Sequence, residues 1–180
     1  MMDIAAHLSD TLKTLRQARG WSLTQAAEQT GVSKAMLGQI ERQESSPTVA
    51  TLWKIATGFN VPFSVFIASA QTQQKLIYAA PQGMTAEPLF PFDPVLGLDF
   101  LVVTLAPGGQ SESSAHEAGT IEHVVVIQGE LQLQTDGEWR TLTPGEGHRF
   151  IADRTHAYRN PTSAPTRFHS LIHYPRHDNP

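Results

Sequence analysis

The residues with the clearest chemical role lie in one stretch, residues 31–42, with the sequence Gly-Val-Ser-Lys-Ala-Met-Leu-Gly-Gln-Ile-Glu-Arg. Ser33 is a typical helix N-cap, and a rotation of about 100° per residue after it places Met36, Leu37 and Ile40 on one side. The other side is small and polar and consists of Lys34, Ala35, Gly38, Gln39 and Arg42. Such a face lets a helix backbone approach base edges in a major groove and offers donors there. The stretch predicts a DNA-reading helix, and the alternative is an ordinary surface helix.

Two preceding helices are needed to position this one. Apolar residues recur at helical spacing across residues 4–19, and Gly20 follows directly. Ser22 is expected to cap a short second helix that runs to Gln29. Gly31 then permits the positive φ of a tight turn, and Ser33 begins the next helix. The spacing predicts a helix-turn-helix.

Two further helices are predicted after the DNA-reading stretch. Pro47 lies near the start of a helix expected over residues 48–59, whose apolar residues recur at helical spacing. Gly58, Asn60 and Pro62 punctuate its end, and the apolar residues 63–67 suggest a fifth short helix. The first 70 residues are therefore expected to form an all-α domain of five helices.

Residues 7–68 resemble the lambda-repressor/Cro-like (XRE family) DNA-binding domain. The residues that carry the resemblance are spread over the whole domain: Leu12, Leu15, Arg16, Ala27, Gly31, Val32, Ser33, Leu37, Gln39, Ile40, Glu41, Pro47, Thr48, Leu52, Ile55 and Ala56. In that family the positions of Arg16 and Glu41 commonly form an ion pair that locks the first helix onto the recognition helix. The resemblance therefore implies an Arg16–Glu41 bridge here.

The resemblance also implies which residues contact DNA. Phosphates would be bound at helix starts by Ser22, Ser33, Ser46 and Thr48, although plain N-capping explains the same residue types and is compatible with that role. Bases would be faced by Lys34, Ala35, Gly38 and Gln39, with Arg42 on the same side. Gln39 can pair with adenine, the Ala35 methyl can touch a thymine methyl, and Lys34 can reach a guanine or a phosphate.

The composition divides the chain into two parts and excludes several functions. The 180 residues carry a net charge of −4, of which residues 1–70 contribute +1 and residues 71–180 contribute −5. The protein is not generally basic, so specific geometry must supply much of any DNA affinity. The absence of Cys excludes disulfides, thiolate metal sites and a cysteine nucleophile. Without a signal-peptide core or a long apolar run, the chain is expected to be cytoplasmic.

The second part changes from helical to strand periodicity. We expect a DNA-binding domain over residues 1–69, a linker and first strand over 70–84, with residues 76–78 already extended, and a second domain over 85–180. Short runs with strand character lie at residues 100–105, 124–127, 131–134, 140–142, 147–151 and 167–174, and Gly-containing turns separate most of them. Many short strands without a helix predict a barrel or jelly roll.

Residues 85–174 resemble the cupin fold through two motifs. His116, Glu122 and Gly129 match the first motif, whose second His position holds Ala118. Gly145, His156 and Asn160 match the second motif, although residues 151–153 replace its usual Pro-x-Gly. The resemblance implies that His116, Glu122 and His156 line a ligand pocket. They could hold iron or another divalent metal facially, or form a polar pocket for a small effector.

Seven of the eight histidines lie in this second domain. His123 has the wrong strand parity to share a face with Glu122. His148, His169 and His173 lie on strands whose inward face the sequence does not assign, so each is either a hydrogen-bonded structural residue or an additional ligand.

An XRE domain followed by a single cupin domain is the arrangement of a group of bacterial transcriptional regulators. Within it, residues 33–54, 121–127 and 168–176 look similar to regulators of sulfur utilisation, which implies an effector tied to sulfur supply. The resemblance implies a non-enzymatic homodimer, assembled with the help of the cupin domain, that binds an imperfect palindrome in double-stranded DNA. One alternative is a metal-dependent cupin oxygenase or isomerase with a DNA-binding appendage. Another is a scaffolding protein whose filled barrel only dimerises.

Overall fold

The N-terminal domain consists of five helices, as the sequence predicts. The computed structural model describes residues 4–67 and 83–175 of the chain. The helices are α1 (Ile4–Ala18), α2 (Leu23–Thr30), α3 (Lys34–Glu41), α4 (Val49–Phe59) and α5 (Ser64–Ile67). Ser22, Ser33 and Thr48 are N-caps of α2, α3 and α4, and each side chain accepts a hydrogen bond from a backbone N–H in the first turn. Gly31 ends α2 with φ 65°, which confirms the expected tight turn.

One apolar core holds the helices together. Its fully buried members include Leu12, Leu37, Ile55 and Phe59. Gly58 brings α4 directly against the end of α2, because a Cβ at this position would lie 2.6 Å from the Gln29 carbonyl oxygen. The two helices therefore pack backbone to backbone at this point.

The second domain is a sandwich of two antiparallel sheets, which is the predicted jelly-roll architecture. The five-stranded sheet has the order β1-β2-β9-β4-β7 and contains β1 (Met84–Asp93), β2 (Leu98–Leu105), β4 (Ile121–Gln128), β7 (Gly147–Ile151) and β9 (Thr166–His173). The four-stranded sheet has the order β3-β8-β5-β6 and contains β3 (Gln110–Ser113), β5 (Leu131–Thr135), β6 (Glu138–Leu142) and β8 (His156–Arg159). Alternate residues of the strands face the space between the sheets, as burial along β9 shows.

Three strands were not predicted from the sequence: β1, β3 and β8. β1 contains Pro88 and Pro91, which normally argue against a strand, but β1 lies at a sheet edge where proline is tolerated. Its pairing with β2 shifts register between Pro88 and Phe90. The expected extended segment 76–78 and most of the predicted linker lie outside the described residues.

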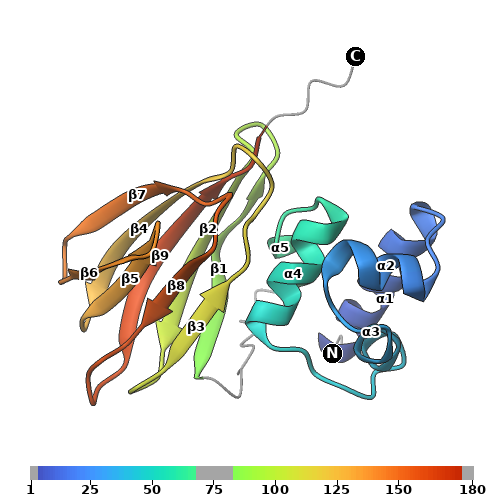
Figure 1. Ribbon diagram of the computed structural model, residues 1–180, viewed down its shortest axis with the longest axis horizontal. Coiled ribbons are helices and arrows are strands. Elements are labelled where there is room, and N and C mark those ends of the chain that lie inside the picture. The colour runs from blue at the N-terminus through green and yellow to red at the C-terminus, as the bar shows by residue number, and fades with distance from the viewer. Residues whose placement is uncertain (1–3, 68–82, 176–180) are drawn as a thin grey trace.

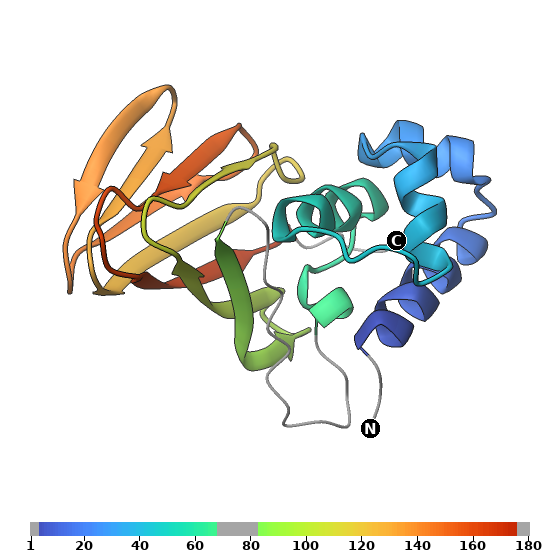
Figure 2. The same ribbon diagram turned by 90° about the horizontal axis from the view of Figure 1, so that it is seen from below.

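The two domains touch along α4 and α5. Figures 1 and 2 show α4 and α5 beside β1 and β3, with α1, α2 and α3 on the far side from the sandwich. The buried Asp99 of β2 accepts hydrogen bonds at Oδ2 from the Ser64 amide at 3.2 Å and from the Tyr174 hydroxyl at 2.8 Å. The same hydroxyl oxygen accepts from the Phe63 amide at 3.1 Å. The barrel therefore holds the start of α5 through hydrogen bonds.

No helix in the described ranges has the length and apolar character needed to span a bilayer.

Candidate nucleic-acid interface and metal centre

The exposed side of α3 carries the residues predicted to read DNA. Lys34, Ala35 and Gln39 are exposed, and they line a groove together with Leu23, Gly38 and Arg42. Leu37 and Ile40 are fully buried on the opposite side, and Met36 is partly buried. The helix therefore presents one alkyl, one ammonium and one amide group at a concave surface.

Gly38, which is expected to face the bases, and Arg42, which is expected on the same side of the helix, lie against each other in the groove. Gly38 is buried, because the Arg42 guanidinium and the Leu23 side chain cover it; a Cβ at Gly38 would lie 3.1 Å from Arg42 Nη1. Arg42 itself donates to Glu44 from Nε at 2.8 Å and from Nη2 at 2.7 Å. Gly38 thus leaves room for the Arg42 side chain, whose Nε and Nη2 already donate to Glu44. Base contacts by Gly38 and by Arg42 stay a prediction.

The predicted bridge between α1 and α3 is present. Arg16 Nε donates to Glu41 Oε1 at 2.6 Å, and Arg16 Nη2 donates to Oε2 at 2.9 Å. Arg16 Nη1 also donates to the Trp21 carbonyl at 2.9 Å. The hydrogen bond to Glu41 raises the pKa of Arg16 further, so the guanidinium stays charged. This two-pronged contact fixes the rotation of α3 relative to α1.

The four residues predicted to bind phosphate fall into two kinds. Ser22, Ser33 and Thr48 stand at the N-termini of α2, α3 and α4, where free backbone N–H groups favour an anion. Ser46 is exposed but caps no helix, since α4 begins at Val49. Phosphate binding by all four stays a prediction.

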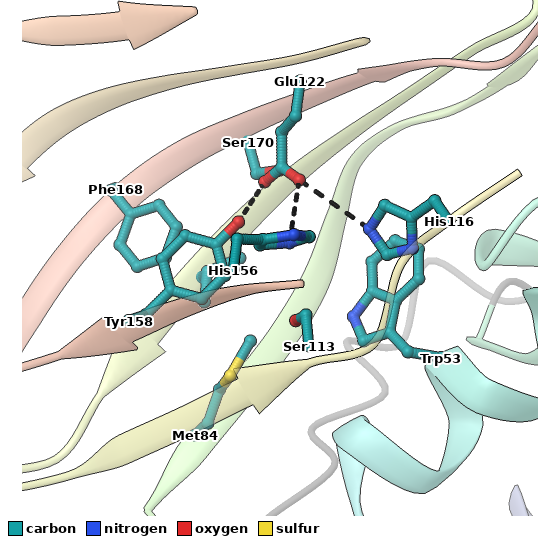
Figure 3. Close-up of a pocket in the computed structure, with 10 residues that line it drawn as sticks. Trp53, Met84, Ser113, His116, Glu122, His156, Tyr158, Phe168 and Ser170 are labelled. Carbon is teal, nitrogen blue, oxygen red and sulfur yellow. Dashed lines mark hydrogen bonds and ion pairs between the residues drawn. The ribbon is translucent and has the colours of Figure 1, made fainter. Parts of the chain in front are cut away.

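Inside the barrel, the structure brings His116, Glu122 and His156 together. His116 lies on the loop after β3, where its amide donates to the Ala152 carbonyl, while Glu122 and His156 point inward from β4 and β8. Glu122 Oε2 lies 3.9 Å from His116 Nε2 and 3.7 Å from His156 Nε2 (Figure 3). One ligand atom of each residue lies within 4.8 Å of the other two.

Neighbouring polar groups orient this cluster. Glu122 Oε1 accepts hydrogen bonds from the Tyr158 hydroxyl at 2.6 Å and from the Ser170 hydroxyl at 2.7 Å. Because a carbonyl only accepts, His156 Nδ1 must donate to the Arg154 carbonyl at 3.0 Å, and Nε2 is the ring nitrogen that faces Glu122. His156 Nε2 and His116 Nδ1 are buried without a hydrogen-bond partner.

Burial shifts the pKa values of two groups at the cluster. It lowers the pKa of His116 to about 3, and the nearby His156 acts in the same direction. Burial and the Glu122 charge raise the pKa of Tyr158 well above its usual value. Two buried imidazoles, each with a ring nitrogen that has no hydrogen-bond partner, beside a carboxylate oriented by two hydroxyls, are a donor set that suits a divalent cation.

The cavity at this cluster is small. Its volume is about 10 Å³, which is space for one water molecule. Met84, Val103 and Phe168 close it from the strands, and Trp53 closes it from helix α4 (Figure 3). The barrel is thus neither completely filled nor open to an organic ligand in this state.

The other histidines that the structure describes in the sandwich do not join the cluster. His123, His169 and His173 alternate with the buried residues of β4 and β9 and therefore face outward. His148 lies in a groove at the far edge, where its Nδ1 accepts from Arg140 Nη1 at 3.3 Å. Asn160, a motif residue, is structural: its Nδ2 donates to the carbonyls of residues 105, 106 and 164.

Sequence reasoning missed three residues of this site. Tyr158 lies two residues after His156, and Ser170 lies two residues from both Phe168 and Ile172 on β9, so strand parity could have placed both of them inward. Trp53 gave no such signal, because it belongs to a helix of the other domain.

The fold and the sites together define a two-domain protein with a helix-turn-helix module and a cupin barrel. Residues 12–66 match the helix-turn-helix family HTH_3, and residues 101–172 match the cupin domain family Cupin_2. The chain is 60% identical over 177 residues to the HTH-type transcriptional regulator SutR of Escherichia coli, with 98% of this chain and 99% of SutR covered. It therefore belongs to the family of HTH-type transcriptional regulators that contains SutR.

Other relatives agree with this assignment. The regulator PuuR of Escherichia coli is 26% identical over 85% of this chain and 86% of its own. The crystal structure of an HTH_3 family transcriptional regulator from Vibrio cholerae superimposes with a TM-score of 0.87 at 40% identity, covering 96% of this chain and 98% of that one. The cupin domain of an XRE family regulator from Enterobacter cloacae is 61% identical, with a TM-score of 0.52, and covers 53% of this chain and 100% of its own.

Proposed function

We propose that this protein is a sequence-specific DNA-binding transcriptional regulator whose cupin domain responds to a small ligand. The observation that carries the proposal is the exposed face of α3, where Lys34, Ala35 and Gln39 line a groove on a helix braced by the Arg16–Glu41 pair. Lysine and glutamine can donate to base edges, and the alanine methyl can contact thymine. The family to which the chain belongs supports the same function.

The regulator is expected to act as a homodimer. Two copies of α3 must then enter successive major grooves about 34 Å apart, so the operator should be an imperfect palindrome with half-sites about one helical turn apart. The near-neutral helical domain supplies little general attraction to DNA. Correct spacing of the two helices therefore accounts for much of the specificity.

The ligand site of this proposal is the His116–Glu122–His156 cluster. The orphaned Nε2 of His156 and the oriented Glu122 carboxylate support a divalent cation as one ligand. The other candidate ligand is a small effector molecule bound in an enlarged pocket. The link to sulfur supply stays a prediction, and sulfur compounds should be screened first.

A matched pair of variants tests the DNA-binding role. Genomic fragments retained by the full-length protein would define the operator, and fluorescence anisotropy would then measure its affinity. Replacing Lys34 and Gln39 by alanine should weaken operator binding by at least about 30-fold, because each lost base contact is worth about 1–3 kcal/mol. Lys13 and Gln17, exposed on α1, are the same residue types away from the groove, and their double alanine variant should bind normally. Wild-type binding by the Lys34/Gln39 variant would contradict the proposal.

The second candidate function is a metal-dependent cupin enzyme, and the buried histidine–glutamate cluster is the observation that favours it. An oxygenase or isomerase needs space for its substrate beside the metal, whereas this cavity has a volume of about 10 Å³. Metal analysis of protein purified without chelators separates the two functions. Stoichiometric iron that is lost in His116→Ala, together with turnover of a substrate, would favour the enzyme.

A further inference from the structure

One wall of the barrel cavity comes from the DNA-binding domain. Trp53 lies on α4 and is almost fully buried. Its ring contacts the His116 imidazole, with 4.8 Å between ring centroids and 34° between planes. Figure 3 shows the indole directly below His116, at the side of the cavity that faces the helices. Whatever fills this cavity therefore touches Trp53 directly or through His116.

Residues at the junction between the two domains hold Trp53 on the side away from His116. Its ring stacks on Phe63 at 4.1 Å with 12° between planes. The Phe63 amide donates to the Tyr174 hydroxyl, which in turn donates to the buried Asp99 of β2. The indole thus occupies one defined position between α4, the start of α5 and the barrel.

The small volume of the cavity means that the position of Trp53 limits what can bind there. One water molecule fills about 10 Å³, so a larger ligand requires a lining residue to move. The lining residues from β2, β8 and β9 belong to strands paired on both sides within their sheets. Trp53 is the lining residue that comes from outside the sandwich, and it is held by side-chain packing rather than by a strand ladder. Its displacement would break no hydrogen bond of either sheet, and it differs in this way from the residues on the doubly paired strands.

Movement of Trp53 reaches the DNA-binding surface through α4. The N-cap of this helix is Thr48, one of the predicted phosphate contacts, and α4 follows α3 after residues 42–48. At its other end, Gly58 packs α4 against the backbone of α2. Because α4 is packed closely against α2, a displacement of the indole that moves α4 is expected to move the helix-turn-helix relative to the barrel as well.

We propose that Trp53 is a ligand-contacting residue of the cupin site, so that the effector pocket is shared between both domains and its occupancy is transmitted to the operator-binding helices through α4. This inference rests on the proposed function. It assigns the DNA-binding domain a direct part in recognition of the effector. Coupling of this kind is reciprocal, so operator binding should also alter ligand affinity.

The test uses the full chain, Co²⁺ as the probe and operator affinity as the readout. Co²⁺ binding is followed by its visible absorption, and the ratio of operator affinities with and without Co²⁺ measures the coupling. We expect a change of at least about fivefold in the wild type and less than about twofold in Trp53→Ala. The variant should still bind Co²⁺, because His116, Glu122 and His156 are intact. Trp139→Ala is the matched control, since this indole is exposed on β6 and contacts Arg159 instead.

Each outcome decides between the alternatives. Coupling in Trp53→Ala equal to that of the wild type overturns the inference. If Co²⁺ leaves the operator affinity of the wild type unchanged, the metal-free operator affinities of Trp53→Ala and the wild type are compared instead. A difference below about twofold then overturns the inference. If Trp53→Ala does not fold, Trp53→Phe replaces it, because phenylalanine presents a smaller ring to His116. Its operator affinities are then compared by the same twofold limit, with Trp139→Phe as the control. A wild-type protein without sequence-selective DNA binding would instead refute the proposed function.

Discussion

The ion pair between α1 and α3 predicts a stability loss that can be estimated from its geometry. Glu41 accepts two hydrogen bonds from Arg16, at 2.6 and 2.9 Å, and the two side chains are only 17% and 10% exposed. A hydrogen bond to a charged group contributes about 1.5–3 kcal/mol. Water can partly replace the lost partner of Arg16, so Glu41→Ala should lower the free energy of unfolding by about 2–4 kcal/mol.

A double-mutant cycle separates the pair from its surroundings. Urea unfolding of the wild type, Arg16→Ala, Glu41→Ala and the double variant, followed by far-ultraviolet circular dichroism, gives the coupling free energy. We expect at least about 1.5 kcal/mol, whereas exposed pairs give about 0.2–1 kcal/mol. Arg42 and Glu44 supply an internal control, because this pair is more than half exposed and should show no measurable coupling.

A coupling between Arg16 and Glu41 as small as that of an exposed pair would refute the reasoning. It would mean that water replaces the contact completely and that the apolar core alone orients α3. Operator binding adds a second readout. If the bridge sets the rotation of α3, the single variants should bind the operator more weakly at temperatures where they remain folded.

Three further outcomes follow from the described contacts. The pKa of His116 is about 3 in the folded protein against 6.5 for the free side chain, so the unfolded chain gains a proton as pH falls and the folded chain does not. The free energy of unfolding of the metal-free protein should therefore fall by about 2 kcal/mol between pH 6.5 and pH 5 from this group, and urea titrations of His116→Gln should lack that contribution. Gly58→Ala would place a Cβ 2.6 Å from backbone atoms of α2 and should cost about 1–3 kcal/mol in thermal unfolding, whereas Lys54→Ala on the exposed side of α4 should be neutral. Tyr158→Phe removes the 2.6 Å hydrogen bond to Glu122 and should weaken Co²⁺ binding about 10–100-fold by calorimetry; an unchanged affinity would show that this hydrogen bond does not orient a metal ligand.

The sequence predicts the helical domain well because each helix carries its own local signals. Ser22, Ser33 and Thr48 are caps in the structure, and Gly31 has the expected left-handed conformation. The Arg16–Glu41 contact spans 25 residues and was predicted through the family resemblance. Strands depend on distant partners and carry weaker local signals. β1 was missed because its two prolines are acceptable only at the sheet edge, which becomes apparent when the sheet order is known.

The candidate site was likewise predictable from the sequence only in part. His116, Glu122 and His156 follow from a motif, and the structure brings them together. Glu122 is oriented by Tyr158 and Ser170, whose positions depend on how β4, β8 and β9 are arranged. Trp53 reaches the cavity only because two domains pack together, and no local pattern encodes that contact. The cover over Gly38 likewise depends on the rotamer that Arg42 adopts beside Glu44.

The position of Trp53 affects how ligands of this protein should be measured. A barrel separated from its helical domain lacks the indole and leaves His116 uncovered on that side. Ligands would then enter without displacing an aromatic ring, but they would also lose their contact with it. The ratio of the dissociation constants of the isolated barrel and the intact chain therefore measures the net contribution of the helical domain to ligand affinity. A ratio near one would mean that the indole contact and the cost of displacing the indole cancel.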